Sequence, residues 1–190
     1  MRRFIFNLVS VLFSAVKFGI MKLFHFHHFF YSGVQRFSPN TEVVIAEGGT
    51  IRLGRHVRAH RRSKLLAMDG GTLEIGSNTA LGNGVSVNCM ESIVIGEGVQ
   101  IGPDTKIYDH DHDYRVPGGI GAGKFVTAPV TIGDNSWIVC IVVFIRGTSI
   151  GKNCIVGAGS VLKGAYPAGS VIVQKRQTTA TVYPLERTEK

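Results

Sequence analysis

The 190-residue chain is poor in the residue types that define several common classes of protein. It has one tryptophan, six prolines and three cysteines, and no cysteine belongs to a C-x-x-C pair. Because Cys89, Cys140 and Cys154 cannot all pair with one another, we expect neither a disulfide framework nor a zinc ribbon. A reducing compartment suits such a chain best.

Acidic residues are scarce at the N-terminal end. Residues 1–64 hold 11 Lys and Arg but only Glu42 and Glu47, a formal charge of +9, whereas residues 65–190 hold 10 against 11 acids, a charge of −1. The excess of positive charge is therefore local. A nearly neutral body with one basic end is not typical of nucleic-acid-binding proteins, so we expect no nucleic acid and one basic surface that meets an anionic partner.

Residues 1–37 have no acid and no long uncharged run, although they hold nine of the eleven phenylalanines. The longest uncharged run, Phe4–Val16, has 13 residues, short of the roughly 20 that cross a membrane. Polar residues recur every three or four positions, which predicts one or two amphipathic helices in an N-terminal segment, residues 1–40. We expect residues 1–36 to lie on an anionic membrane surface. Packing on the protein body or a sister subunit, and a signal peptide, are the alternatives.

Glycine is plentiful in the remainder, since 22 of 24 glycines lie at or after Gly48. Aliphatic residues there step by six in the series Ile75, Leu81, Val87; Ile95, Ile101, Ile107; and Ile132, Ile138, Phe144, Ile150. A period of six fits neither a simple helix nor a simple strand, and it predicts a chain that turns a corner every six residues. Three such hexads would close a coil of about 18 residues, with coils stacked about 4.8 Å apart. Cys154 falls in a small inward position and is expected to pack inside.

The hexads, of the form [LIV]-G-x-x-[STAV]-x, resemble those of the hexapeptide-repeat acyltransferases over about residues 50–172. The runs "VTIGDNSWI" and "SIGKNCIVGAGSVL" are similar to the sugar O-acetyltransferases, including the maltose, galactoside and capsule or lipopolysaccharide enzymes. The resemblance implies a mainly β, left-handed parallel β-helix. It also implies a homotrimer with each active site between adjacent prisms, and acetyl transfer from acetyl-CoA to a hydroxyl or an amine.

The rhythm gains two residues between Val87 and Ile95, which predicts a bulge around Cys89–Glu91, and it breaks at "KIYDHDHDYRVPGG". Ile107 and Ile132 are 25 residues apart where one hexad would use six, so a loop over residues 108–128 is expected to leave the prism. We place the acyltransferase domain at residues 41–175 and a polar tail at residues 176–190. In the family, a loop at this point carries the catalytic histidine.

A sugar hydroxyl needs a general base near neutral pH, and histidine is suited to that role. By the family's spacing from Pro103, and by the motif His-Asp-Tyr, the resemblance assigns the base to His112, with His110 as the alternative. Asp109, Asp111 or Asp113 would orient the imidazole.

A zinc site is the competing interpretation of these two histidines. It would need a third ligand, for which His56 and His60 are the candidates outside the N-terminal region, and neither looks well placed. The run "HFHH" at residues 25–28 has no carboxylate or thiol beside it and fits an aromatic interfacial segment better. We therefore expect no metal.

The resemblance places acetyl-CoA along the prism beyond the loop. It implies contacts from Trp137, Cys140, Ala158, Gly159 and Lys163, with Lys175 and Arg176 near the nucleotide phosphates. Two stretches depart from the family pattern: "WIVC" replaces the usual "WIG", and "SVIVQKRQ" replaces the usual ending. For the acceptor, we expect contacts from Asn83, Asn88, Glu91 and Tyr114.

The basic residues Arg52, Arg58 and Lys64 are six apart, so they should girdle the first coil and make that end of the prism positive. A solvated cap on the open end is the alternative interpretation.

We expect an acetyl-CoA-dependent sugar O-acetyltransferase acting on a cell-surface polysaccharide or its precursor. It would be cytoplasmic and peripheral on the inner face of the membrane. N-acylation of an amino sugar and a non-catalytic membrane scaffold are the alternatives.

Overall fold

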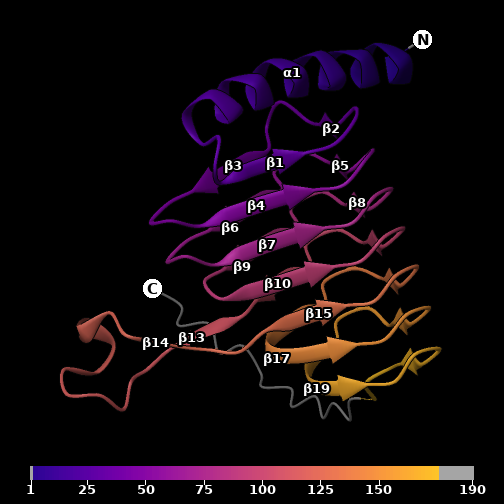
Figure 1. Cartoon of the computed structure of the whole chain (residues 1–190). Helices are drawn as coiled ribbons and strands as arrows, with labels where there is room; N and C mark the ends of the chain where they lie inside the picture. The colour runs from indigo at the N-terminus through magenta and orange to yellow at the C-terminus, as the bar shows by residue number, and fades with distance from the viewer. Residues whose placement is uncertain (1, 176–190) are drawn as a thin grey trace, which may run out of the picture.

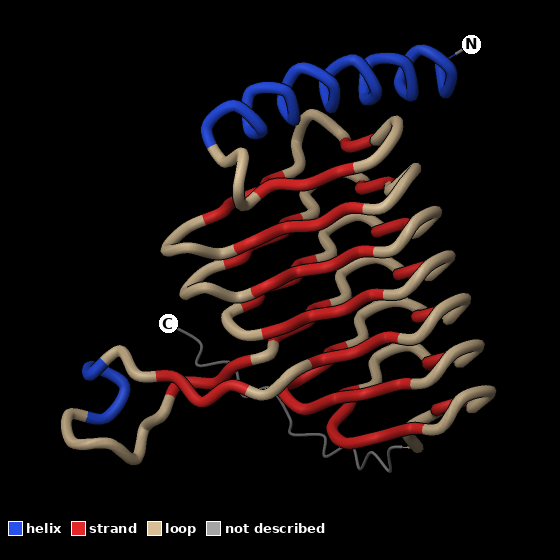
Figure 2. The backbone as a smooth tube through the Cα atoms, viewed as in Figure 1, coloured by secondary structure: helices blue, strands red, loops and turns tan. Residues whose placement is uncertain are grey.

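The structure, a computed structural model of the chain, describes residues 2–175. A long helix, α1 (Arg2–Phe24), lies across one end of a column of short stacked strands (Figure 1). The tube in Figure 2 shows successive turns of the chain lying parallel below the helix. The predicted parallel β-helix is confirmed, and all strand pairs within the column are parallel.

Three faces make up the column. The first face consists of β1 (Phe29–Tyr31), β4 (Thr50–Leu53), β7 (Thr72–Ile75), β10 (Ser92–Ile95) and β15 (Val130–Ile132). The second face consists of β2 (Arg36–Phe37), β5 (Arg58–Ala59), β8 (Ala80–Leu81), β11 (Gln100–Ile101), β16 (Trp137–Ile138), β18 (Ile155–Val156) and β20 (Val171–Ile172). The third face consists of β3 (Glu42–Ile45), β6 (Lys64–Ala67), β9 (Ser86–Cys89) and β12 (Lys106–Tyr108). Two longer strands, β17 (Val143–Ile150) and β19 (Val161–Tyr166), continue from the third face around the corner onto the first.

The six-residue series forms the core of the column. Ile132, Ile138 and Phe144 are all buried, one from each face, and Cys154 is buried with them. Each inward side chain stacks on its equivalent in the next coil, as Ile51 does on Leu73. Ladders of this kind explain why aliphatic residues recur at a fixed period.

Coil length departs from the expected 18 residues. The inward residues that stack on one another down the first face are Phe29, Ile51, Leu73, Ile93 and Val130. They give coil lengths of 22, 22, 20 and 37 residues. Only the later coils step by 18, as from Thr131 to Ser149. The extra residues all enter at one corner, between the third and first faces, where the chain can bulge outward without disturbing the inward ladders. The bulge predicted around Cys89–Glu91 lies at this corner.

The column begins earlier than residue 41. Within the segment assigned to residues 1–40, β1 and β2 already pair with β4 and β5, so the first coil starts at Phe29. A single helix precedes it. The Phe-rich composition of residues 29–37 obscured this boundary because Phe29 and Phe37 are core residues of the first coil.

Candidate active site

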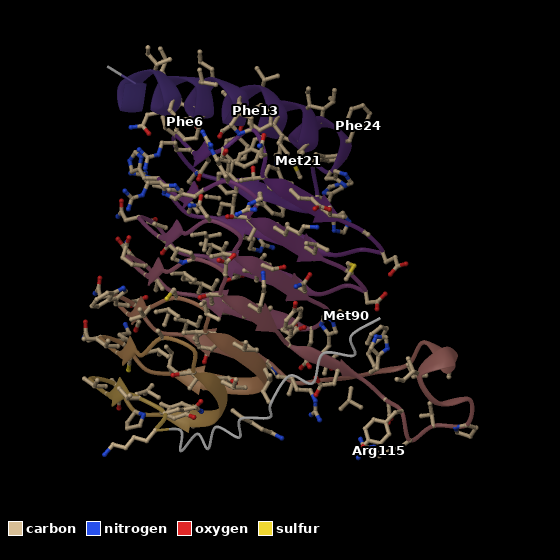
Figure 3. The ribbon with its side chains drawn as sticks, turned by 180° about the vertical axis from the view of Figure 1, so that it is seen from behind. Phe6, Phe13, Met21, Phe24, Met90 and Arg115 are labelled. Atoms are coloured by element: carbon tan, nitrogen blue, oxygen red, sulfur yellow. The ribbon has the colours of Figure 1, made fainter. Side chains whose placement is uncertain are left out.

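The break in rhythm is a β-hairpin that projects from the corner between the third and first faces. Its strands, β13 (His110–His112) and β14 (Phe125–Thr127), are antiparallel, and a short 3-10 helix, η1 (Gly119–Ala122), lies towards its tip (Figure 1). The predicted excursion over residues 108–128 is therefore present, but it is more regular than an open loop. Arg115 lies far out on it, and Met90 lies at the corner of the prism (Figure 3).

Asp109 anchors the root of the hairpin. Its side chain is fully buried, and its carboxylate accepts hydrogen bonds from the backbone N–H groups of Met90, Glu91 and Ser92 at 2.8 to 3.1 Å. These N–H groups belong to the corner of the preceding coil. The carboxylate thus satisfies three backbone donors at this bulge, of which that of Met90 belongs to a buried residue.

The same carboxylate orients one histidine. Nδ1 of His110 lies 3.0 Å from an oxygen of Asp109. Because a carboxylate can only accept, Nδ1 carries the hydrogen, and Nε2 of the neutral ring keeps a free lone pair.

Burial alone would raise the pKa of the Asp109 carboxyl. The hydrogen bonds from His110 and from the Glu91 and Met90 backbone outweigh this effect and hold the pKa below its ordinary value. Burial, together with the neighbouring carboxylate, raises the pKa of the Cys89 thiol. Asp109 is therefore a buried anion, and Cys89 beside it stays a thiol.

His110 and His112 lie on the same side of β13 and both contact the ring of Phe125, at centroid distances of 5.6 and 4.5 Å. The side chain of His110 is only 14% exposed, whereas His112 is exposed. Within residues 2–175, the His112 ring has no hydrogen-bond partner, so Asp109 orients His110 and not His112.

The other two aspartates of the hairpin pair with arginines. Asp111 lies 2.6 Å from the guanidinium of Arg146 in β17, a contact that ties the hairpin to the prism. Asp113 lies 3.2 Å from Arg115. Neither Arg146 nor Phe125 was identified from the sequence, because both meet the histidines' strand only through the fold. The periodicity of β17 does mark Arg146 as a residue between two inward positions.

The predicted acceptor residues fall into two groups. Asn88 in β9 lies beside Tyr108, and Glu91 lies at the corner that Asp109 caps, so both are near the hairpin. Tyr114 is 70% exposed on the hairpin itself. Asn83 is different, because it lies at the corner between the second and third faces, where its carbonyl accepts from Asp104.

The predicted coenzyme residues lie away from the hairpin within one chain. Trp137 is 54% exposed on the second face, and Cys140 meets Gly159 at the corner that follows, with Ala158 beside it. Lys163 is exposed on β19, and Lys175 is exposed at the end of the described chain. Arg176 lies outside the described residues. In Figure 1 the second face, marked by β5 and β8, lies on the side of the column away from the hairpin.

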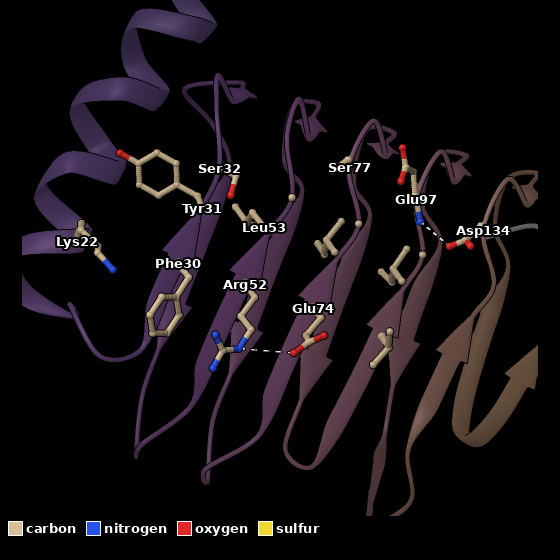
Figure 4. A pocket seen from close by; sticks show the side chains of 16 residues that line it. Lys22, Phe30, Tyr31, Ser32, Arg52, Leu53, Glu74, Ser77, Glu97 and Asp134 are labelled. Carbon is tan, nitrogen blue, oxygen red and sulfur yellow. Dashed lines mark hydrogen bonds and ion pairs between the residues drawn. The ribbon is translucent and has the colours of Figure 1, made fainter.

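A long groove lies elsewhere on the column. It has a volume of about 910 Å³ and follows the first face from Phe30 to Asp134 (Figure 4). Arg52 and Glu74 pair across its floor at 3.6 Å, and Asp134 accepts the backbone N–H of Glu97. Neither hairpin histidine lines this groove, so it is separate from the predicted chemistry.

Metal ligands do not gather in the part of the chain that the structure describes, where no three His, Cys, Asp or Glu side chains come together. His56 and His60 are exposed on the coil near α1, at the bends that flank β5. The two hairpin histidines leave the prism two coil steps further down.

The stacked coils and their six-residue period are those expected from the resemblance to hexapeptide-repeat proteins, and comparison with known proteins finds the same likeness. Residues 120–164 match the family model of the bacterial transferase hexapeptide (six repeats). The chain is 32% identical over 126 residues to a probable acetyltransferase of Mycobacterium tuberculosis, covering 65% of this chain and 41% of that protein. It is 27% identical over 138 residues to an Escherichia coli K12 protein named as the lipopolysaccharide biosynthesis O-acetyl transferase WbbJ, covering 67% of this chain and 69% of that one.

A solved structure extends the likeness. A hexapeptide-repeat-containing acetyltransferase of Vibrio cholerae O1 biovar eltor, complexed with acetyl coenzyme A, matches with a TM-score of 0.54 and 25% identity. The match covers 82% of this chain and 69% of that chain. The resemblance to hexapeptide-repeat acetyltransferases is thus confirmed, although this chain spans less than half the length of the mycobacterial relative.

Proposed function

We propose that this protein is an acetyl-CoA-dependent O-acetyltransferase that modifies a sugar hydroxyl of a cell-surface polysaccharide or its precursor. The observation that carries the proposal is the hairpin, which presents an exposed histidine beside a buried, charged Asp–His pair on a hexapeptide-repeat prism. The named activities of the similar proteins, acetyl transfer and O-acetyl transfer in lipopolysaccharide biosynthesis, support the reaction type and the acceptor class.

His112 is the proposed general base. A base must lie within hydrogen-bond reach of the hydroxyl proton, and the ring of His112 is exposed whereas that of His110 is largely covered. His112 takes the proton as the hydroxyl oxygen attacks the thioester carbonyl carbon. The C–O bond forms, the C–S bond breaks, and the proton passes to the leaving thiolate of CoA. His110 and Asp109 hold the hairpin root, and Asn88 and Glu91 line the acceptor side.

The proposed site is completed by a second chain. Trp137 and Cys140, which the resemblance assigns to acetyl-CoA, lie on the second face and its corner, away from the hairpin of the same chain. A homotrimer with prisms side by side brings the hairpin of one chain towards the second face of its neighbour. Lys163 and Lys175 are exposed cations that suit the coenzyme phosphates.

The test is release of free thiol from acetyl-CoA with a panel of sugars and amino sugars. We expect acceptor-dependent release that falls about a hundredfold or more in His112→Ala, since a general base contributes typically 10²–10⁴-fold. His60→Ala, an exposed histidine on another corner, is the matched control and should keep wild-type rates.

Other outcomes of this test are equally informative. Loss of release in His110→Ala with activity kept in His112→Ala would move the base to His110. Release with amino sugars alone would make the enzyme an N-acetyltransferase. No release with any acceptor, together with no binding of acetyl-CoA, would contradict the proposal and favour a scaffold.

A further inference from the structure

Helix α1 turns its apolar side away from the protein. Its exposed residues from Ile5 onward are all apolar or glycine, and they recur at helical spacing: Ile5, Leu8, Val9, Leu12, Ala15, Val16, Gly19, Ile20, Leu23 and Phe24. We call this set the outer face. Leu12 is 58% exposed and Val16 65% exposed. A helix on the surface of a water-soluble prism normally shows the opposite pattern.

The polar side of α1 is fixed against the column. The hydroxyl of Ser14 accepts the backbone N–H of Phe37 at 2.7 Å and donates to the carbonyl of Ser10. Lys17 donates to the carbonyl of Thr41 at 2.9 Å. Rolling the helix to hide the outer face would break these hydrogen bonds.

An aromatic cluster holds the same orientation. Phe18 is fully buried, with ring centroids 5.1 Å from Phe29 and 4.8 Å from Phe37. The ring of Phe18 closes the end of the inward ladders. By length and composition, Ile5–Phe24 is long and apolar enough to cross a membrane, with a mean hydropathy of 1.6. The contacts of Ser14, Lys17 and Phe18 nevertheless keep the helix lying across the end of the column.

Positive charge gathers at the end of the column beside the helix. Lys22 lies at the C-terminal end of α1, Arg61 stacks over Phe6 at 5.0 Å, and Arg52 stacks over Phe30 at 4.4 Å. Residues 1–64 carry a formal charge of +9. A second copy docked on the outer face would bring the same charge against it, whereas an anionic lipid surface offers both an apolar layer and the opposite charge.

We propose that α1 docks the protein on an anionic bilayer, with the helix lying in the headgroup region and the outer face in contact with the acyl chains. The cations nearest the helix, Lys22 and Arg61, meet the lipid phosphates, whereas Arg52 and Lys64 pair with Glu74 and Glu42. Figure 1 shows the helix axis lying across the end of the column, so the docked column stands away from the bilayer.

Docking also bears on the acceptor, and this step rests on the proposed function. Three coil steps separate β1 from β10, beside which the hairpin leaves, and each step is about 4.8 Å. The hairpin of a docked chain therefore stands roughly 15–20 Å from the headgroups. A sugar carried on a membrane lipid reaches that height, so the proposed acceptor is a membrane-presented glycan.

The test is co-sedimentation of the full chain with vesicles of phosphatidylcholine alone or with one-third phosphatidylglycerol. We expect binding to the anionic vesicles that weakens in high salt. Leu12→Glu with Val16→Glu should lower the partition coefficient about tenfold or more. Val171→Glu with Val173→Glu, two exposed valines at the other end of the column, is the control, because it changes net charge equally and should lower binding far less.

Two results would overturn docking. One is wild-type protein that stays in the supernatant with anionic vesicles. The other is an equal loss in both double variants, which would leave net charge as the cause and the outer face without a role. If Leu12→Glu with Val16→Glu alters the mass in light scattering but not vesicle binding, the outer face is a contact between copies instead. Because vesicle binding is measured without substrate, its failure is distinguishable from failure of the proposed acetyl transfer.

Discussion

At the scale of the residue, Asp109 connects the hairpin that interrupts the repeat to the prism and to His110 of the candidate site. It follows the last inward residue before the hairpin, and its carboxylate reaches back to the corner of the preceding coil. A shorter or neutral side chain would leave three backbone donors of that corner without a charged acceptor. The hairpin that carries both histidines would then lose its anchor at the prism.

A first prediction concerns the stability contribution of this carboxylate. Because the folded-state pKa of Asp109 is lowered, its stabilisation is present above the unfolded pKa of about 3.9 and is lost as pH falls through the folded value. Asp109→Asn should therefore lower the free energy of unfolding at pH 7 by about 1–3 kcal/mol. The difference from wild type should shrink below about pH 4.

Urea unfolding at a series of pH values, at one fixed protein concentration, measures this difference. Asp113→Asn is the matched control, because the pKa of that carboxyl is also lowered but its partner Arg115 is exposed. A wild-type-like free energy in Asp109→Asn at pH 7 would contradict the anchoring role.

At the scale of the element, the recurrent aliphatic–glycine pair marks two corners of the prism, those that follow the first and the second faces. At the corner between the first and second faces, a glycine follows the inward residue in each of four successive coils. These glycines, which stack directly above one another, are Gly54, Gly76, Gly96 and Gly133. A Cβ on Gly76 would lie 2.5 Å from the backbone of Gly96 and of Glu97. Close stacking of coils therefore excludes any side chain there.

Gly76→Ala should be destabilising, because the backbone of two coils would have to separate. Overpacking of this kind costs about 1–3 kcal/mol. Gly121→Ala, in the 3-10 turn with nothing within 4 Å of its added Cβ, is the control and should change stability by no more than about 0.5 kcal/mol. Thermal unfolding measures both, and equal midpoints in the two variants would refute the packing argument.

Insertions gather at another corner. The coils before the hairpin carry extra residues between the third and first faces, and the hairpin occupies the same corner. At the corner between the first and second faces, and at that between the second and third faces, the chain keeps its six-residue spacing. Stacked glycines and the inward ladders leave no room for extra residues at these two corners. The hairpin is thus the longest member of a series of bulges at the one permissive corner.

At the scale of the whole molecule, the two halves of the proposed site lie on different sides of one chain. One half is the hairpin with His112, and the other is the second face with Trp137. We expect light scattering to give three times the chain mass of 20.6 kDa. Mixed oligomers of His112→Ala and Trp137→Ala should recover part of the thiol release, because one wild-type site forms between suitable neighbours. A monomeric mass, or no recovery in co-purified mixtures, would place both halves in one chain.

Much of the fold was predictable from the sequence by itself. The six-residue period, the coil architecture and the position of the hairpin follow from local patterns, because each hexad has the same inward residue and bend. The spacing of Arg52, Arg58 and Lys64 also predicted that they lie on three faces, and they do. They girdle the second coil and not the first, because the first coil starts at Phe29.

Only the tertiary structure decided which groups meet across the coils. The bonds from Asp109 to the corner at Met90 and the bond from Ser14 to Phe37 join segments that a periodic pattern does not relate. The sequence predicted an amphipathic helix near the N-terminus, but not that its polar side would face the prism. That choice depended on the open end of the column. There the backbone of Phe37 and Thr41 bonds Ser14 and Lys17, and Phe18 packs on Phe29 and Phe37, which leaves the outer face exposed.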